Sequence, residues 1–431
     1  MNATESIYPR LIRPVPDPLG LYFRIGRGNQ ADFLNALAAG IDNCFGVVLD
    51  PSIGKQHDEL RQRVLAKKLD VVLDPRTQQS ALPGGYNENL GALPWGVGHC
   101  HTHSDFEGTR ARRLVTVLAD YAVEHGYTQV FAPTHLVASA DDEWISLDLE
   151  CTRLLRNSLD RRGGSHIPVI YPLAISGRVF RDADQRERLI ESLRGVPAAQ
   201  LWLQVDGFGS TSSSTATRAY IEAAEDFRSV GVPVVGDYVG GLAGLAMLSF
   251  GAIGGISHGV TLLERFDTSN WRRPPSGGGF RWPTRVYLRA LDIHLKCSEA
   301  EDLFDRSTRA RALFACKDTH CCPRGTIDMV ERPGSHFLYQ RMSELVTLSK
   351  IPEQVRPQEF LEQFLRPTTD NALAAANVHW NNDVIEKRFR EQRKRLDSMR
   401  VALSQHLRDH GQRPTLLLPR TRAVRESRLG A

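Results

Sequence analysis

Six short apolar runs in this chain each lead to an aspartate or a histidine. A strand buried in a parallel sheet is almost wholly apolar, because helices cover both faces of the sheet. A titratable side chain at the carboxyl end of such a strand leaves the core and points into the loops, where α/β barrels carry out their chemistry. The pattern therefore predicts an enzyme, without indicating its substrate. The runs are VVLDP at Val47–Pro51 and again at Val71–Pro75, VFAPTH ending at His135, LWLQVDG with Asp206, VPVVGD ending at Asp237 and GGISHG with His258.

Strand-like and helix-like segments alternate along most of the chain. This alternation favours a parallel sheet with crossover helices, and eight units favour a closed (β/α)8 barrel of the TIM type, with an open doubly wound sheet as the alternative. The expected strands are 20–26, 42–50, 69–75, 128–135, 167–175, 200–207, 232–239 and 254–260. The expected helices are 29–39, 57–68, 109–125, 144–159, 182–193, 216–230 and 242–250, with the helix of the last strand coming late, at 298–315.

Three regions are expected. Residues 1–315 form the barrel, residues 316–380 a Cys/His segment with a helical extension packed on the barrel, and residues 381–431 a basic helical tail that is partly disordered. Long Gly-, Pro- or Ser-rich loops at 76–105, 207–217 and 261–283 interrupt the rhythm of the barrel. Loops of this length in a compact domain commonly serve as lids or binding loops, so we expect them to surround one mouth.

The composition is that of a soluble globular protein, with 41% hydrophobic and 24% charged residues among 431. No apolar stretch reaches the roughly 18 residues that a membrane span needs, and the first residues lack the layout of a signal peptide. We therefore expect a cytoplasmic protein with no membrane partner. Of the seven cysteines, Cys316, Cys321 and Cys322 lie close together, which fits metal binding in a reducing compartment better than a disulfide framework.

The positive charge is concentrated at the C-terminus. From Lys387 onward there are 13 Lys/Arg and 4 Asp/Glu, a net +9, so the preceding residues carry −5 of the total +4. Basic tails often contact phosphate backbones, which makes a nucleic acid a candidate partner. The alternative is a solvated helix whose charges pair at i,i+4. The sequence does not indicate an oligomeric state.

The segment CKDTHCCPRG, followed by His336, is the sharpest local signal. Zinc in structural sites is held tetrahedrally by four Cys or His side chains. The best set here is Cys316, Cys321, Cys322 and His336, with His320 as a substitute. Because the cluster follows the last strand, we expect a structural rather than a catalytic zinc. The alternative is a set of small buried thiols that holds no metal.

The segment HCHTHSD places histidines at 99, 101 and 103. It resembles the metal-binding HxH of amidohydrolases and the opening motif of PHP-type phosphoesterases. On that resemblance, His99, His101 and His135, together with His258 and Asp237, would hold one or more divalent ions that activate water for hydrolysis. The alternative is a polar rim loop that happens to be rich in histidine. His101 is also a candidate for substrate binding.

Carboxylates and glycines at strand ends complete the candidate site. Asp206 and Asp237 end neighbouring strands and are candidates for nucleophile and base, with His135 and His258 as further catalytic candidates. Asp50 and Asp74 form an earlier pair that could bind substrate or simply cap a turn before proline. Gly240 and Gly241 follow the seventh strand and open a helix, where free backbone N–H groups could bind phosphate, or where close helix packing needs glycine.

A barrel, the GGLA segment at Gly240–Ala243, a Cys-rich cluster with a downstream histidine and a basic helical end together resemble the tRNA-guanine transglycosylase superfamily. The resemblance implies exchange of a base in RNA or DNA. One Asp would link covalently to the ribose and a second would manage protons, with GGLA binding the base and the Cys/His set binding zinc. The nucleophile of that family follows the eighth strand, where this chain has His258, so Asp206 or Asp237 would have to replace it. A non-catalytic scaffold whose tail recruits a partner is the remaining hypothesis.

Overall fold

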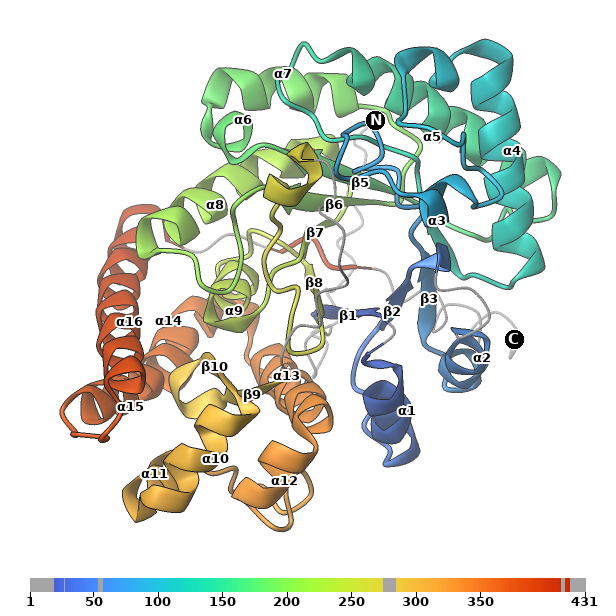
Figure 1. The fold of residues 1–431 in the computed structure, drawn as a ribbon. Coiled ribbons are helices and arrows are strands. Elements are labelled where there is room, and N and C mark those ends of the chain that lie inside the picture. The colour runs from blue at the N-terminus through green and yellow to red at the C-terminus, as the bar shows by residue number, and fades with distance from the viewer. Residues whose placement is uncertain (1–18, 27, 53–56, 274–283, 412–414, 419–431) are drawn as a thin grey trace, which may run out of the picture.

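A computed structural model describes residues 19–26, 28–52, 57–273, 284–411 and 415–418. Eight parallel strands form a closed barrel in sequence order, and the last strand pairs with the first to complete it. The (β/α)8 prediction is thereby confirmed (Figure 1). The strands are β1 Gly20–Ile25, β2 Gly46–Leu49, β3 Asp70–Leu73, β4 Gln129–Phe131, β5 Val169–Ile175, β6 Gln200–Val205, β7 Val234–Asp237 and β8 Gly255–Gly259.

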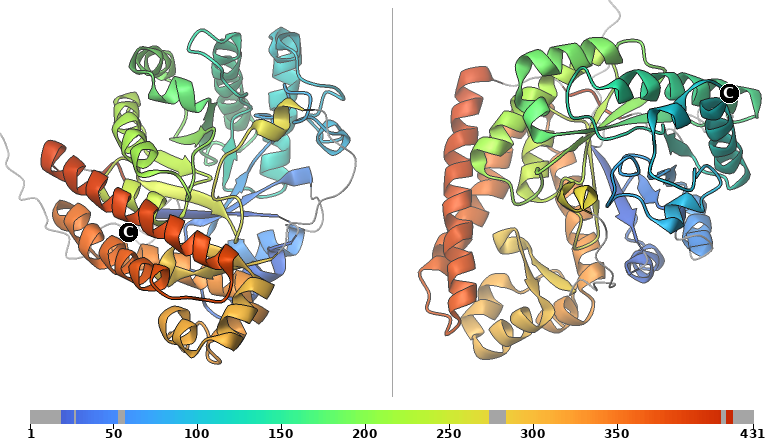
Figure 2. Two further views of the ribbon diagram at one scale, coloured as in Figure 1. Left: turned by 60° about the vertical axis from the view of Figure 1, so that its left-hand side comes forward. Right: turned by 45° about the horizontal axis from the view of Figure 1, so that its top comes forward.

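Helices surround the barrel and cover the outer face of the sheet, as Figures 1 and 2 show. All seven helices expected between the strands are present, and two short helices add to them. In chain order these are α1 Gln30–Ala38, α2 Asp58–Ala66, the short α3 Glu88–Gly91, α4 Gly108–Glu124, α5 Glu143–Arg161, the short α6 Gly177–Arg181, α7 Ala183–Leu193, α8 Ser214–Asp226 and α9 Gly241–Ser249. Among the described helices, none has the length and apolar composition required to cross a bilayer.

Alternate residues of each strand belong to two separate cores. Because side chains on a strand alternate between its faces, one set fills the lumen and the other packs under the helices. The lumen holds an aromatic and aliphatic layer in which Tyr22 packs against Trp202, with ring centroids 5.1 Å apart. The same alternation turns the polar residues of the upper strand ends inward. The lumen set is Tyr22, Phe45, Val48, Val72, Phe131, Ile170, Trp202, Val235 and Leu418.

Leu418, far along the chain, packs into the lower end of this lumen. The paired residues Gly20 of β1 and Gly255 of β8 make room for it, since a Cβ added to either would lie 2.3 Å from Leu418 Cδ1. A short C-terminal segment thus closes the bottom of the barrel. The prediction that the tail 381–431 is partly disordered stays a prediction, since residues 412–414 and 419–431 lie outside the described part.

The helix that completes the barrel is α13 (Pro333–Ser349), and the expectation of segment 298–315 in this place was wrong. α13 contacts both α9 and α1, and its Phe337 packs edge-on against His258 of β8 with ring centroids 5.6 Å apart. Segment 298–315 lies within α10 (Cys297–Arg306) and α11 (Thr308–Phe314) instead. Both stretches have an apolar stripe, and a helical pattern alone does not say which stripe meets the barrel.

An appended unit lies between β8 and α13. It contains the antiparallel hairpin β9 (Arg285–Leu288) and β10 (Ile293–Lys296), then α10, α11 and α12 (Thr326–Glu331). After α13 the chain forms α14 (Arg356–Phe360), a π-helical turn at Leu361–Leu365, and α15 (Arg366–Ala376). The long α16 (Asp383–His410) then runs along α15 and α8 (Figure 2).

The basic region is therefore largely a packed helix. One face of α16 is buried, including Phe389, Leu396 and Leu403. Two of its arginines bind carboxylates of the appended unit, Arg388 to Glu299 and Arg395 to Asp292. The exposed face carries the remaining cations, among them Lys387, Arg390, Lys394 and Arg400.

Candidate active site at the barrel mouth

Arg24 of β1 lies at the centre of the upper lumen and is almost fully buried. It shares the inward parity of Tyr22, so its guanidinium points along the lumen toward the carboxyl ends of the strands. Arg24 Nη1 donates to Asp74 Oδ2 at 2.7 Å, and Arg24 Nε donates to Asp237 Oδ1 at 2.8 Å. Burial alone would lower the pKa of Arg24, but Asp237 and its neighbours raise it well above its usual value. One cation thus unites the ends of β1, β3 and β7.

Both oxygens of Asp237 are occupied. Besides Arg24, Gln204 Nε2 donates to Oδ2 at 2.8 Å and the backbone N–H of Tyr238 donates to Oδ1 at 3.0 Å. The side chain is 0% exposed. The Tyr238 ring lies over the guanidinium, 4.3 Å from Arg24 Cζ to the ring centroid. This environment suits a carboxylate that holds Arg24 in place better than one that attacks a substrate.

Asp206 and Asp50 are the more accessible of the predicted carboxylates. Asp206 follows β6; its side chain is 23% exposed, and its Oδ1 accepts the backbone N–H of Thr268 at 2.8 Å. Asp50 follows β2 and pairs with Arg76 at 3.1 Å, with 20% of its side chain exposed. The structure therefore brings Asp50, Asp74, Asp206 and Asp237 to the same end of the barrel, two of them sealed against Arg24 and two open to the mouth.

The long loops meet over this end, as predicted. The N–H of Gly84 in the loop after β3 donates to the carbonyl of Trp271 in the loop after β8 at 2.8 Å. The loop after β8 also pairs with the loop after β6 through a bridge between Gly209 and Arg265. Residues 274–283 of the expected loop 261–283 lie outside the described part.

Three turns at the rim hold non-glycine residues in left-handed backbone conformations. Arg76, Tyr238 and Thr261, which follow β3, β7 and β8, each have φ of 61°. Such conformations cost about 1–3 kcal/mol and tend to occur where function requires them. Two of the three lie against the Arg24 layer, since Tyr238 covers the guanidinium and the N–H of Arg76 donates to Asp74 Oδ1 at 2.9 Å.

The structure adds Asp267, a carboxylate that the sequence pattern missed. It lies in the loop after β8 and is exposed, next to Thr268, which binds Asp206. The N–H of Ser269 donates to Asp267 Oδ1 at 2.9 Å, and the hydrogen bonds from Ser269 hold the pKa of this carboxyl below its usual value. A loop separates Asp267 from the end of β8, so Asp267 lies outside the pattern of titratable residues directly after strands.

A chain of three groups, two of them buried and the third partly buried, forms at the end of β4. Asp148 of α5 accepts from His135 Nδ1 at 2.8 Å and from the backbone N–H of His135 at 2.7 Å. His135 Nε2 lies 3.0 Å from His101 Nδ1. Burial lowers the pKa of both His101 and His135 to about 3, so both rings are neutral at pH 7.

Neutral imidazoles carry one N–H and one bare nitrogen each. If Asp148 accepts from His135 Nδ1–H, then His135 Nε2 accepts from His101 Nδ1–H, and His101 Nε2 is left as a bare acceptor. Uptake of a proton at His101 Nε2, with each of the other two protons shifted one place toward Asp148, reverses the polarity and leaves Asp148 protonated and His101 Nε2 as a donor. The chain can therefore pass a proton between the interior and His101, which is only partly buried.

The three histidines of HCHTHSD point in three directions. His99 is exposed and its Nδ1 lies 2.8 Å from the carbonyl of Cys100, while His103 pairs with Glu143 at 2.9 Å. Among the described residues, the groups of three or more side chains placed to share a metal ion include neither His99, His101 nor His135. The ligand set expected for a metal-dependent hydrolase is not assembled here.

His258 lies on the outer face of the barrel. Its side chain points to the same face of β8 as that of Ile256, which packs under the helices. Its ring contacts the rings of Phe23 and Phe337. The ring is fully buried, with Nδ1 2.9 Å from the carbonyl of Gly259 and 3.9 Å from Glu264. The prediction that His258 joins the carboxylates of the mouth was wrong, because its position along β8 directs the side chain to the opposite face.

Carboxylates of the chain itself occupy the space beside the two glycines at the start of α9. A Cβ on Gly240 would lie 2.1 Å from Glu264 Oε1, and one on Gly241, where φ is +62°, would lie 2.9 Å from Asp292 Oδ1. Asp292 also accepts the N–H of Leu242 at 3.2 Å. A carboxylate thus takes the position at this helix N-terminus where a phosphate was expected, and close packing accounts for both glycines.

The four predicted zinc ligands converge. Cys316, Cys321, Cys322 and His336 each offer one atom, and all four atoms lie within 4.8 Å of one another. His336 Nδ1 is 3.3 Å from both Cys321 Sγ and Cys322 Sγ, and the two sulfurs are 3.6 Å apart. In a tetrahedral zinc site, with Zn–S of ~2.3 Å and Zn–N of ~2.0 Å, such edges are about 3.5–3.8 Å. The residues therefore fit zinc. The sulfurs of the adjacent residues Cys321 and Cys322 both face the centre of the group.

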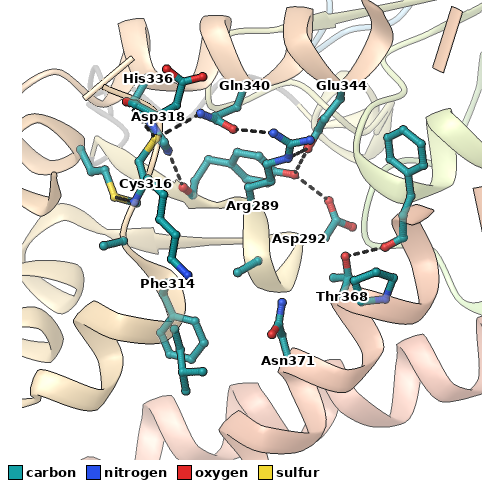
Figure 3. A pocket seen from close by; sticks show the side chains of 18 of the residues that line it. Arg289, Asp292, Phe314, Cys316, Asp318, His336, Gln340, Glu344, Thr368 and Asn371 are labelled. Atoms are coloured by element: carbon teal, nitrogen blue, oxygen red, sulfur yellow. Dashed lines mark hydrogen bonds and ion pairs between the residues drawn. The ribbon is translucent and has the colours of Figure 1, made fainter. Parts of the chain in front are cut away.

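Neighbouring groups fix the orientation of these side chains. His336 Nε2 lies 3.0 Å from the carbonyl of Tyr287, which can only accept, so Nε2 carries the proton and Nδ1 presents its lone pair to the sulfurs. Gln340 Nε2 donates to Cys316 Sγ at 3.3 Å, and its Oε1 accepts from Arg289 at 3.1 Å (Figure 3). Hydrogen bonds from Cys321 and Cys322 hold the pKa of the Cys316 thiol well below its usual value.

His320 does not belong to this group, since its side chain is 89% exposed and lies beside Asp318. On its other side the cluster borders a cavity of about 650 Å³ between α13 and α15. Figure 3 shows Cys316, His336 and Gln340 on one wall of the cavity and Thr368 and Asn371 on the other. No two of the seven cysteines form a disulfide.

No protein-family model matches the sequence, and no curated protein matches it either. Solved structures give low-scoring matches to barrel enzymes. Type I 3-dehydroquinate dehydratase from Clostridium difficile is 9% identical, with TM-score 0.35, over 60% of this chain and 91% of that chain. A GH26 β-mannanase from Bacteroides ovatus is 10% identical (TM-score 0.36; 59% and 83%), and a class V chitinase from Pseudomonas fluorescens is 11% identical (TM-score 0.36; 70% and 78%). At these scores the reactions of those enzymes carry no argument about this chain.

Proposed function

We propose that the barrel mouth is the active site of an enzyme that exchanges a base in a nucleic acid. The observation that carries the proposal is the pair of accessible carboxylates, Asp206 and Asp267, above the buried Arg24 layer. The backbone hydrogen bond from Thr268 to Asp206 holds the loop that bears Asp267 beside Asp206. Two carboxylates in different environments can divide the roles of nucleophile and acid–base group. The resemblance to tRNA-guanine transglycosylases supplies the reaction.

Asp267 fits the nucleophile better than the two aspartates favoured from the sequence. It follows the eighth strand, as the resemblance requires, and its side chain is exposed, with a pKa below the usual value. In the proposed reaction its carboxylate bonds to the ribose C1′ as the glycosidic C–N bond breaks and the electron pair leaves with the base. Asp206 supplies the proton that the departing base takes up. A nitrogen of the incoming base then attacks C1′ and releases the Asp267 carboxylate, while Asp206 takes the proton that this nitrogen loses.

The remaining rim residues would position substrate. Arg24, fixed by Asp74 and Asp237, is a permanent cation beneath the mouth. Asp50 with Arg76 offers further hydrogen bonds at the edge. The Asp148–His135–His101 chain gives a second route for a proton between the mouth and the interior, because it ends on a partly exposed imidazole.

In this proposal the zinc is structural. When bound, it would crosslink the loop after α11 to α13 and so join the appended unit to the helix that completes the barrel. Nothing in the reaction passes through it. The cluster lies on α13 beside the appended hairpin, while the carboxylates lie at the mouth over the strand ends.

The exposed cations of α16 are proposed to contact the phosphate backbone. Lys394 and Arg400 are exposed, so they can be changed without disturbing the buried face of the helix. Charge removal there should weaken binding of RNA or DNA uniformly across sequences. Each cation removed from a phosphate should also reduce the slope of the salt dependence by about one unit.

The test is incorporation of radiolabelled guanine into RNA or DNA by the full-length protein. We expect incorporation by the wild type, no incorporation by Asp267→Asn or Asp206→Asn, and weaker nucleic-acid binding in a Lys394→Gln, Arg400→Gln double variant. A protein that binds neither RNA nor DNA at low salt would remove the proposal. Binding without incorporation, unchanged by the Asp variants, would favour a scaffold instead.

A further inference from the structure

A second group of side chains with metal-binding chemistry joins α16 to the barrel helix α8. His406 and His410 lie one turn apart on α16, with ring centroids 4.7 Å apart. Glu222 lies on α8, against which α16 packs. One atom from each of the three side chains lies within 4.8 Å of the others.

The distances leave room for an ion between these groups. His406 is 2% exposed, yet its Nδ1 has no hydrogen-bond partner. The nearest carboxylate oxygen, Glu222 Oε1, lies 3.5 Å from it, too far for a good hydrogen bond. An imidazole nitrogen and a carboxylate oxygen that share a zinc ion at ~2.0–2.1 Å are separated by about 3.4 Å. A buried nitrogen without a partner, aimed at such a gap, indicates a ligand that the protein atoms do not supply.

We propose that Glu222, His406 and His410 bind a divalent transition-metal ion that fastens α16 to α8. Two imidazoles and one carboxylate suit Zn²⁺, Co²⁺ or Ni²⁺, and His410 is exposed, so the site is open to solvent on one side. Water can complete the coordination from that side.

The site should bind more weakly than the Cys cluster. Glu222 Oε1 also accepts from Arg218 Nε at 2.7 Å, and the guanidinium competes with a cation for the same oxygen. Three neutral or carboxylate ligands also release less free energy than a thiolate set does. The two sites can therefore be separated by affinity.

The experiment uses full-length protein loaded with zinc, then exchanged into a mild chelator and dialysed against Co²⁺, with metal analysis of the retentate. We expect the wild type to keep its zinc and take up one Co²⁺ per chain. His410→Ala and Glu222→Gln should each weaken Co²⁺ binding at least tenfold. His379→Ala is the matched control, because His379 is an exposed histidine paired with a single glutamate, and it should bind Co²⁺ as the wild type does.

Equal Co²⁺ uptake by the wild type, His410→Ala and Glu222→Gln would overturn the proposal, as would no uptake by the wild type. Both ligand changes lie at least partly in solvent, so neither is expected to unfold the chain. The readout is metal content and affinity rather than catalysis, so its result is independent of the base-exchange proposal.

Discussion

Arg24 Nε lies 2.8 Å from Asp237 Oδ1, and this contact joins the first and seventh strands inside the lumen, past the eighth strand between them. A charged pair this deeply buried is stable only if each partner keeps its hydrogen bonds, because removal of one partner leaves an uncompensated charge. Asp74 and Gln204 complete the arrangement from β3 and β6. The floor of the mouth is therefore rigid, and the accessible chemistry lies in the loops above it.

The first prediction separates structural from reactive carboxylates. Asp237→Asn should lower the free energy of unfolding by about 3–5 kcal/mol, since it leaves much of the Arg24 charge unpaired in the core. Asp206→Asn should lower it by less than about 1 kcal/mol, because that side chain is partly exposed. Urea unfolding followed by circular dichroism measures both. Equal losses for the two variants would contradict the assignment of Asp237 as an anchor.

The second prediction concerns the Cys/His cluster. Purified protein should contain one tightly held zinc, and Cys316→Ser, Cys321→Ser, Cys322→Ser or His336→Ala should each lose it and lower the melting temperature by several degrees. His320→Ala is the control, because His320 lies in the same loop but is exposed. Elemental analysis with differential scanning calorimetry gives the result. Zinc retained in the His336 variant would show that the ion is held elsewhere.

The third prediction is a dependence of stability on pH. His101 and His135 have pKa values of about 3 in the folded protein, below the ordinary value of 6.5, so the unfolded chain binds more protons between these limits. The free energy of unfolding should therefore be unaffected by them above pH 7. It should fall as the pH drops below 6.5, by up to about 2 kcal/mol per ring at pH 5.

His101→Gln should make this decline shallower, because one of the two depressed groups is gone. Unfolding midpoints in urea between pH 7.5 and pH 5 measure the slope for both proteins. Parallel slopes would mean that His101 titrates normally in the folded state.

The fourth prediction tests the start of α9. Gly241→Ala should destabilise the protein by about 1–3 kcal/mol, since it places a Cβ against Asp292 in a left-handed backbone conformation. Gly244→Ala, three residues on in the same helix, meets only ordinary contacts at 3.5 Å and should be nearly neutral. Thermal unfolding of the two variants gives the comparison, and similar melting temperatures would contradict the packing role.

Local patterns were sufficient to predict the barrel. Each strand was visible as an apolar run such as Val71–Leu73, because burial on both faces requires it. The convergence of Cys316, Cys321, Cys322 and His336 was predictable too, since Cys and His residues clustered in this way are typical of a metal site. The place of α13 in the barrel was not predictable, because a stripe of apolar residues shows that one face of a helix is buried but not which element it packs against.

The site at the mouth was only partly predictable. The carboxylates after strands were predictable, but their exposure depends on Arg24, a single charge inside an otherwise apolar strand whose role has no local signal in the sequence. Asp237 points into the lumen and His258 points away from it. Which alternate residues of a strand face the lumen is fixed only once the register of the barrel is known. Asp267 was missed because a loop separates it from β8.

The fifth prediction concerns the covalent bond that base exchange requires. Full-length protein incubated with RNA or DNA and then denatured should give a species of combined mass in mass spectrometry, with the link located by peptide mapping at Asp267. Asp267→Asn should give none, while the folded fraction of Asp237→Asn should still give some. A linked species that persists in Asp267→Asn, or that maps to another residue, would contradict the assignment of Asp267 as the nucleophile.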